Sequence, residues 1–385
     1  MTFRNRSARR RVLFVIPSLH GGGAERVIVT LLRHLDRNEF EPTLAVADLR
    51  NAAYREDVPD DIELIDLNVH RVRYALPRVA RLVWQRRPDV VFSTLIHLNL
   101  GMAMIRPFLP AGVRVIGRES ILVSELIATL KWPKLWAWAF RHLYSQLDLV
   151  VCQSADMRRD LIERYEFPPE RTALIHNPID IDRARAKAAD ALPSDLAQAL
   201  GRTASGKLKL VAAGRLAPQK GFDLLLEAVA QSRDRIGSLV LLGEGPERSA
   251  LEQLSRTLGI SKLVTFAGFR ANPYAIYGRA DAFVLSSRYE GFPNVVLEAL
   301  ACGIPVIATP APGGVNEIAA MTGGVTMASS IDAAALAEAI RRFAEVSGGD
   351  TRIAMGSFAV ERIVQNYEAL LRPVLALNHR PAHEC

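Results

Sequence analysis

The chain has 385 residues, of which 49% are hydrophobic, and it carries a formal net charge of +7. This length exceeds what one core normally serves, and the apolar content excludes a disordered chain, so we expect two domains. The three cysteines lie far apart and form no CxxC or Cys/His pattern, which argues against a disulfide framework or a structural zinc site and fits a reducing compartment. No apolar run reaches the roughly 18 residues that span a bilayer. We expect a cytoplasmic protein, either soluble or peripheral on the cytoplasmic face of the inner membrane.

The excess of positive charge lies in the first part of the chain. Residues 1–150 carry 22 Lys and Arg against 15 Asp and Glu, whereas the remainder is balanced. Such a basic half can attract nucleic acid, anionic lipid or a phosphorylated ligand, and a solvated basic surface explains it equally well. The arginine-rich start precedes an apolar run that ends at Pro17 and a glycine loop, without a cleavage site, so we interpret this run as a buried strand rather than a signal peptide.

Short apolar runs alternate with longer helical patterns along the whole chain, which is typical of parallel sheets covered by helices. In the first half the predicted strands are Arg11–Pro17, Thr43–Ala47, Val90–Ser93, Val113–Gly117, Leu149–Cys152 and Ala173–Ile175. In the second half they are Lys209–Ala213, Ser238–Leu242, Val264–Phe266, Ala282–Leu285, Val306–Ala308 and Gly324–Met327. The predicted fold is α/β, with two tandem Rossmann-like, doubly wound parallel-sheet domains facing a central cleft, where ligands of such sheets bind.

The expected boundaries follow from where this alternation stops and restarts. We expect a first domain over residues 1–185 and a second over residues 208–365. Residues 186–207 are rich in Ala, Asp and Arg without a strong apolar pattern, so they are the predicted linker. Residues 366–385 are predicted to form a helix or tail that returns to the first domain.

Three glycines follow the first strand. Gly21, Gly22 and Gly23 precede a predicted helix, and glycines at this position let the backbone approach an anionic or hydroxyl-rich ligand at the helix N-terminus. The spacing is not GxGxxG, so a tight turn without a ligand is the alternative.

Two cations follow the first strand of the second half. Gly214 and Arg215 end that strand, and Lys220 comes just before the next predicted helix. A guanidinium that grips two phosphate oxygens and a compact ammonium beside a helix N-terminus suit a diphosphate. Taken alone, the pair would be interpreted as two solvated loop cations.

Two carboxylates flank the start of a later helix. Glu290 precedes a turn formed by Gly291 and Pro293, Asn294 is placed to cap the helix, and Glu298 lies inside it. The two carboxylates address different parts of one long ligand. A polyhydroxylated ligand fits, because a carboxylate accepts two adjacent hydroxyl donors, such as those of a ribose.

Taken in order, these motifs resemble family 4 glycosyltransferases (glycosyl transferase group 1, GT-B fold). The segments that carry the resemblance are Gly214–Arg215 with Lys220–Gly221, Leu242–Pro246, Phe266–Phe269, Glu290–Asn294 with Glu298–Ala299, and Gly303–Ala308. They cover nearly the whole second half. The first half resembles the family more loosely, through the glycine loop and residues 175–180.

The resemblance implies a role for each matched residue. It implies that Arg215 and Lys220 hold the donor diphosphate, that Glu290 lies at the donor sugar, and that Glu298 binds the ribose hydroxyls. Arg215, Lys220 and Glu290 are the implied catalytic residues. The implied donor-binding set is Gly22, Gly23, His97, Gly214, Gly268, Phe269, Gly291, Phe292, Pro293, Asn294, Val295 and Glu298. For His97 a packed histidine in an apolar run is an equal alternative, and Arg118 and Glu119 are weaker candidates.

The implied activity is retaining transfer of a hexose or N-acetylhexosamine from a nucleotide-diphosphate sugar, with UDP favoured. The resemblance implies no cofactor and no obligatory metal, and we find no DxD-type motif. Fixed cations at the departing diphosphate would lower the barrier. Whether Glu290 is a nucleophile or orients the sugar stays open, and we favour orientation. A nucleotide-sugar epimerase and a non-catalytic nucleotide-sugar-binding protein are the alternatives.

The acceptor is expected in the basic half. The segment 126–143 combines cations with tryptophans, which is typical of helices in a membrane interface. Its members are Lys131, Trp132, Lys134, Trp136, Trp138 and Arg141. We expect the Lys131–Arg141 region to dock on anionic lipid and the acceptor to be a lipid-linked saccharide, with no nucleic acid partner. The alternative is a helix whose tryptophans pack in the first domain.

Overall fold

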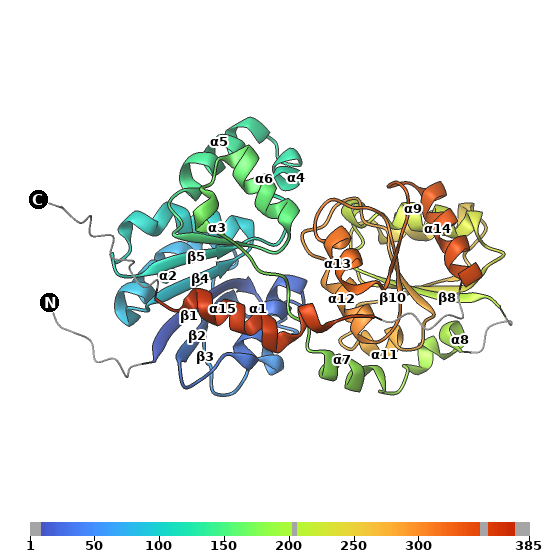
Figure 1. Cartoon of the computed structure of the whole chain (residues 1–385), viewed down its shortest axis with the longest axis horizontal. Coiled ribbons are helices and arrows are strands. Elements are labelled where there is room, and N and C mark those ends of the chain that lie inside the picture. The colour runs from blue at the N-terminus through green and yellow to red at the C-terminus, as the bar shows by residue number, and fades with distance from the viewer. Residues whose placement is uncertain (1–8, 202–205, 347–352, 374–385) are drawn as a thin grey trace, which may run out of the picture.

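The structure is a computed structural model of the chain, and it describes residues 9–201, 206–346 and 353–373. Figure 1 shows two α/β domains side by side, each with one sheet covered by helices. No helix in these ranges is long and apolar enough to cross a membrane.

The first domain is built on a seven-stranded parallel sheet in the order β3-β2-β1-β4-β5-β6-β7. Its strands are β1 (Arg10–Ser18), β2 (Phe40–Asp48), β3 (Glu63–Asp66), β4 (Val90–Thr94), β5 (Arg114–Arg118), β6 (Leu149–Cys152) and β7 (Thr172–Leu174). Side chains of β1 alternate between the two faces of the sheet, so Leu13 and Val15 enter one core while Phe14 and Ile16 enter the other. The helices of this domain are α1 (Gly23–His34), α2 (Val72–Arg86), α3 (Ile96–Ile105), α4 (Val123–Ala128), α5 (Pro133–Tyr144) and α6 (Ala155–Tyr165).

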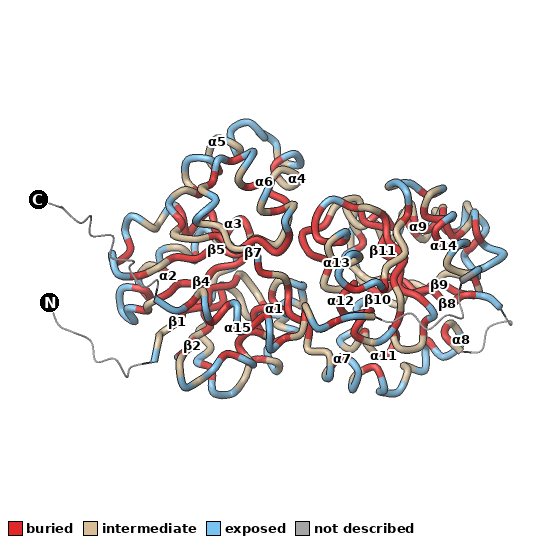
Figure 2. Tube along the Cα trace, viewed as in Figure 1, coloured by how far each residue is buried: buried red, intermediate tan, exposed pale blue. Residues whose placement is uncertain are grey.

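The second domain repeats the plan with a six-stranded parallel sheet in the order β10-β9-β8-β11-β12-β13. The strands are β8 (Leu208–Ala213), β9 (Ile236–Leu242), β10 (Val264–Gly268), β11 (Ala282–Leu285), β12 (Val306–Ala308) and β13 (Val325–Met327). The helices are α7 (Ile181–Ala188), α8 (Ala197–Leu200), α9 (Phe222–Gln231), α10 (Arg248–Thr257), α11 (Tyr274–Tyr277), α12 (Asn294–Ala301), α13 (Val315–Thr322) and α14 (Ala333–Val346). Figure 2 shows the strands of both sheets buried between layers of helices.

The prediction of two tandem parallel-sheet domains is confirmed, and each predicted strand has an observed counterpart whose ends lie within a few residues. The sequence reading missed β3. This edge strand is half-buried at best and lacks the continuous apolar run that marks the central strands, because only one side of it is paired.

The chain crosses between the domains near Ile179, earlier than the predicted linker. The Ile179 N–H donates to the Phe358 carbonyl (2.9 Å) and the Val360 N–H donates to the Ile179 carbonyl (3.1 Å), so the outgoing and returning segments lie side by side. Within residues 186–207, Leu196 and Leu200 are buried in a core of the second domain because they are spaced one helical turn apart. Residues 202–205 of that segment lie outside the described residues.

The last described helix, α15 (Val360–Leu371), belongs to the first domain. It packs against α1, and Ile363, Val364 and Tyr367 enter the core on that face of the sheet. In Figure 1 this helix lies beside α1, far from the second-domain helices that precede it in sequence. Of the predicted helix or tail 366–385, residues 374–385 lie outside the described residues.

Candidate active site in the cleft between the domains

One cleft collects the loops at the carboxyl ends of the central strands of both sheets. In each sheet the chain order reverses between two neighbouring strands, β1 and β4 in the first and β8 and β11 in the second. Ligands of doubly wound sheets bind at these reversal points. The loops that follow these four strands line a cavity of about 740 Å³, a volume within the range of small-molecule sites.

The cleft brings together nearly all the site residues predicted from the sequence. Those that line it are Gly22, Gly23, His97, Gly214, Arg215, Lys220, Phe269, Glu290, Gly291, Phe292, Pro293, Asn294, Val295 and Glu298. Gly268 is not among the lining residues. It lies at the end of β10 with φ of 70°, and its carbonyl accepts the Gly243 N–H at 2.8 Å, so it shapes the loop behind the cleft wall.

Lys220 and Glu290 form an ion pair on the second-domain wall. Lys220 Nζ lies 2.7 Å from Glu290 Oε1, and the Ser287 hydroxyl donates to the same oxygen at 2.5 Å. Glu290 is only 5% exposed, and these partners offset the cost of burying a polar group. Its position is therefore fixed from two sides.

Arg215 differs from Lys220, which is paired with Glu290. Its side chain is exposed within the cleft lining, and among the described residues it makes no hydrogen bond or ion pair. A guanidinium has five donors in a planar fork, so Arg215 is available to an anionic group that enters the cleft.

The two loops that carry these groups are fastened to each other. The Arg288 N–H donates to the Gln219 carbonyl at 2.8 Å, and the Gln219 side chain donates to the Tyr289 carbonyl at 3.0 Å. The Ser286 hydroxyl donates to the Lys220 carbonyl at 2.9 Å. These bonds connect the loop after β8 to the loop after β11, so the cations and Glu290 keep a fixed relative geometry.

His97 enters the cleft from the first domain. It is exposed at the start of α3, so it is not the packed histidine of the alternative reading. Desolvation by the surrounding walls lowers the pKa of His97 below its usual value. Leu95, just after β4, has φ of 75°, a conformation that non-glycine residues rarely adopt and that is often found at functional sites. This turn directs the following residues toward the cleft.

Asn294 does not cap its helix as predicted. The first residue before α12 is Pro293, and no side chain caps the helix. The Asn294 side chain instead donates to the Gly23 carbonyl at 2.8 Å and accepts from Asn177 at 2.5 Å, so it joins the two domains. The sequence favoured capping because asparagine commonly caps helices, and the cross-domain partners are invisible in a local pattern.

Two glycines allow the domains to approach closely at this point. A Cβ on Gly291 would collide with the Ser120 carbonyl of the first domain, and a Cβ on Gly23 would lie 2.8 Å from the Asn294 amide. Both glycines therefore serve the contact between walls, in addition to any turn they make.

Glu298 is held by a residue that the sequence reading missed. Arg26 of α1 forms an ion pair with Glu298 across the domains, and Glu298 is only 3% exposed. The Arg26 guanidinium lies over the rings of Tyr54 and Tyr274, 5.2 and 5.9 Å from their centroids. Its position could have indicated a role in the site, since Arg26 lies in the first turn of the helix that follows the glycine loop.

Arg118 and Glu119 form a buried polar layer behind the cleft. Arg118 is fully buried and donates to Asn177 at 2.5 Å and to Tyr367 at 3.2 Å. The Glu119 carboxylate accepts from Asn99 at 2.7 Å and from the Tyr144 hydroxyl through one oxygen, and its second oxygen has no partner among the described residues. Burial raises the pKa of Glu119 to about 7, and the hydrogen bond from Asn99 only partly opposes this. Arg118 lines the cleft, whereas Glu119 stabilises the wall behind it.

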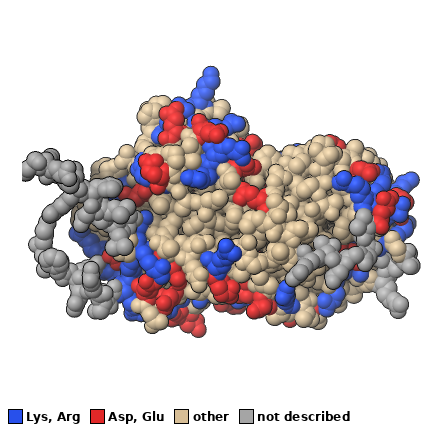
Figure 3. Space-filling view, in the orientation of Figure 1, with Lys and Arg blue, Asp and Glu red and all other residues tan. Residues whose placement is uncertain are grey.

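The tryptophan-rich segment contributes to two helices, α4 and α5, which lie at the top of the first domain in Figure 1. Trp132 is 61% exposed and Trp138 is 57% exposed, while Phe140 and Tyr144 of the same helix are buried. These tryptophans therefore do not pack in the core of the domain, which removes the alternative reading. On the face in view, Figure 3 shows both signs of charge around this end of the domain.

Among the described residues, no group of three or more His, Cys, Asp and Glu comes together in a way that could hold a metal ion.

Comparison with known proteins places both halves of the chain in one functional class. The family model described as Glycosyltransferase Family 4 matches residues 21–183, and the model described as Glycosyl transferases group 1 matches residues 199–361. The lipopolysaccharide core biosynthesis glycosyltransferase LpsE of Rhizobium meliloti is 35% identical over 371 residues, covering 91% of this chain and 96% of that protein.

A second relative and one solved structure extend the comparison. N-acetylgalactosamine-N,N'-diacetylbacillosaminyl-diphospho-undecaprenol 4-alpha-N-acetylgalactosaminyltransferase of Campylobacter jejuni is 28% identical, covering 79% of this chain and 81% of that protein. The crystal structure of Anabaena HepE in complex with UDP has a TM-score of 0.74 at 22% identity, covering 94% of this chain and 99% of that one. That likeness shows the shared GT-B fold.

Proposed function

Because this chain belongs to the family 4 glycosyltransferases, we propose that it transfers a hexose or N-acetylhexosamine from a UDP-sugar to a lipid-linked saccharide, with retention of anomeric configuration. The observation that carries this proposal is the guanidinium of Arg215, which has no partner among the described residues and lines the same cleft as the Lys220–Glu290 pair. Arg215 and Lys220 together offer two cations to a diphosphate, and the carboxylate of Glu290 is fixed next to Lys220.

The proposed chemistry follows from the charges. As the sugar leaves, negative charge grows on the diphosphate, and Arg215 and Lys220 stabilise it in a site that needs no rearrangement. Glu290 orients the sugar through its fixed carboxylate, and a leaving phosphate oxygen takes the acceptor proton. His97 reaches the sugar from the opposite wall, and Glu298 accepts the ribose hydroxyls.

UDP is supported as the nucleotide by the structural likeness to a protein solved with UDP, and the cavity is large enough for a nucleotide sugar. The lipid-linked acceptor is supported by relatives named for lipopolysaccharide core synthesis and for an undecaprenol-linked substrate. We propose that no metal is required, because the two cations supply the charge at the diphosphate.

The surface of α5 supports docking of the protein on the cytoplasmic face of a membrane. Trp132, Leu135 and Trp138 are each more than half exposed, and Lys131 lies over the Trp132 ring at 5.4 Å. Exposed tryptophans beside cations suit an interface with anionic lipid. The neighbouring helix α4 reaches the cleft through Leu126, so an acceptor held in the membrane at α5 lies next to the entrance of the site.

The test is transfer of labelled sugar from a panel of UDP- and GDP-sugars to a membrane lipid extract, read in the lipid phase with and without EDTA. We expect transfer from a UDP-sugar at an unchanged rate in EDTA, and an α-linked product from an α-linked donor by NMR. Transfer only from a GDP-sugar, inversion, or activity lost in EDTA and restored by Mn²⁺ would each contradict the corresponding part of the proposal. A free epimer without transfer would contradict all of it.

A further inference from the structure

Arg26 connects the glycine loop of the first domain to Glu298 of the second domain. Its Nε and one terminal nitrogen donate to the Tyr54 hydroxyl at 2.9 and 2.6 Å, and the Tyr54 hydroxyl donates to the Gly21 carbonyl at 3.1 Å. The other terminal nitrogen of Arg26 bonds Glu298 Oε1. We call Gly21, Tyr54, Arg26 and Glu298 the Arg26 network.

The guanidinium in this network lies between aromatic rings of the two domains. The ring centroids of Tyr54 of the first domain and Tyr274 of the second lie 5.2 and 5.9 Å from it, and such cation–π contacts favour one orientation of a planar cation. Desolvation lowers the pKa of Arg26, but attraction to Glu298 and the two tyrosines outweighs it and keeps the group charged.

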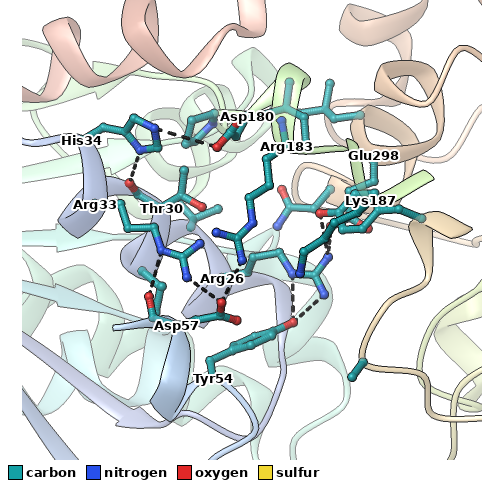
Figure 4. Close-up of a pocket in the computed structure, with 18 residues that line it drawn as sticks. Arg26, Thr30, Arg33, His34, Tyr54, Asp57, Asp180, Arg183, Lys187 and Glu298 are labelled. Atoms are coloured by element: carbon teal, nitrogen blue, oxygen red, sulfur yellow. Dashed lines mark hydrogen bonds and ion pairs between the residues drawn. The ribbon is translucent and has the colours of Figure 1, made fainter. Parts of the chain in front are cut away.

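The network also separates two cavities. Arg26, Tyr54 and Glu298 line the large cleft, and they also line a second cavity of about 60 Å³ beside Ile179, where the chain crosses between the domains; we call it the hinge cavity. Figure 4 shows this hinge cavity, with Arg33 and Arg183 pointing toward Asp57 and Arg26 pointing toward Tyr54. The Arg26 network is therefore the shared wall, and Glu298 is held from behind.

Among the described residues, Arg26 is the only side chain that bonds the Glu298 carboxylate, and it bonds Oε1. This leaves Oε2 and one lone pair of Oε1 as acceptors. A carboxylate fixed in this way accepts two adjacent hydroxyls with little further loss of side-chain conformational entropy, because its rotamer is already set before the ligand binds.

We infer that Arg26 is a positioning residue for nucleotide recognition: it orients Glu298 toward the ribose hydroxyls and makes that orientation depend on the glycine loop. The inference rests on the proposed role of Glu298 at the ribose. It adds that discrimination for ribose is set by both domains, although only the second domain carries the carboxylate.

The test measures binding of UDP against 2'-deoxy-UDP, and of GDP against 2'-deoxy-GDP, by calorimetry, so that no acceptor is needed. We expect the wild-type protein to prefer the ribonucleotide by about tenfold or more, as for one hydrogen bond to a charged group. In Arg26→Met this preference should fall below about threefold, because the affinity for the ribonucleotide falls while that for the deoxynucleotide changes little.

Three variants control the result. Arg33→Met, on the same helix and facing the hinge cavity, should keep the wild-type preference, because Arg33 bonds Asp57 rather than Glu298. Arg26→Lys should be intermediate, since one ammonium cannot bond Tyr54 and Glu298 through a planar fork. Tyr54→Phe keeps the ring and should lower the preference in the same direction, with no further loss in the double variant.

The possible outcomes distinguish failure of the inference about Arg26 from failure of the proposed function. Equal loss of affinity for both nucleotides in Arg26→Met and Tyr54→Phe would show a merely structural role and overturn the inference. If Arg26→Met does not fold, Tyr54→Phe alone decides. If Glu298→Gln keeps the ribose preference, or the wild-type protein shows none, the proposed role of Glu298 is wrong; if the wild-type protein binds neither UDP nor GDP, the proposed function is wrong.

Discussion

Lys220 Nζ and Glu290 Oε1 lie 2.7 Å apart on loops that follow two neighbouring strands, β8 and β11. The carboxylate of this pair accepts from both the Lys220 ammonium and the Ser287 hydroxyl. Its geometry fixes a carboxylate beside a cation, and Arg215, which has no partner in the described part of the chain, lines the same cleft. The predictions below test what each of these groups does.

Replacing Arg215 by Ala should lower kcat by about 10²–10³, because one electrostatic contact to the charge that develops in the transition state is lost. Binding of UDP should weaken much less than turnover falls. The measurement is steady-state kinetics with the donor identified by the panel. Arg256→Ala, an exposed cation on α10 away from the cleft, is the matched control and should keep wild-type kinetics. Equal kcat in both variants would remove Arg215 from the catalytic groups.

Glu290→Gln distinguishes an orienting carboxylate from a nucleophile. If Glu290 orients the sugar, the amide keeps part of the hydrogen bonding, and we expect turnover reduced by about 10–10² with product of retained configuration. Intact-protein mass spectrometry of the wild-type protein with a slow fluorinated donor should show no sugar adduct. An adduct on Glu290, or loss of more than about 10⁴ in kcat, would indicate covalent catalysis instead.

The exposed tryptophans of α5 predict binding to anionic vesicles. A Trp132→Ser/Trp138→Ser variant should lose most of the flotation with vesicles that contain phosphatidylglycerol, and remain folded because both side chains are solvent-exposed. Met321→Ser, an exposed apolar residue on α13 of the second domain, is the control and should float like the wild-type protein. Absence of wild-type binding to both anionic and zwitterionic vesicles would rule out membrane docking.

Glu119 predicts a pH-dependent stability of the first domain. Burial raises its pKa from 4.5 to about 7, so the folded protein holds the proton more tightly than the unfolded chain does. The stabilisation is complete below the unfolded pKa and is lost as the pH rises through 7, by on the order of 3 kcal/mol. Glu119→Gln should therefore flatten the dependence between pH 5 and 8.

Urea unfolding followed by circular dichroism measures this effect, because the 4 tryptophans are solvent-exposed in the folded protein and report unfolding poorly. Glu163→Gln on the exposed face of α6 is the control, and its pH profile should match that of the wild-type protein. A wild-type profile that is flat, or that rises between pH 5 and 8, would contradict the buried protonated carboxyl.

The sequence by itself determined the two parallel sheets and the positions of the loops that carry Arg215, Lys220, Glu290 and Glu298. Periodicity and strand length are local properties, and the carboxyl ends of parallel strands meet at one edge, so motifs that follow separate strands come together without further information. In the segment expected to be a linker, Leu196 and Leu200 pack because a surface of the second domain exists for them, which composition does not reveal.

Only the tertiary structure decided which groups meet across the domains. Arg26 pairs with Glu298, and Asn294 donates to Gly23 instead of capping its own helix, because both contacts depend on how two separately folded sheets are placed. The sequence pattern likewise did not determine that Trp132 is exposed, since the pattern of an amphipathic helix does not show which of its faces is turned toward the domain. Side-chain partners far apart in sequence are set by long-range packing, and no local pattern encodes them.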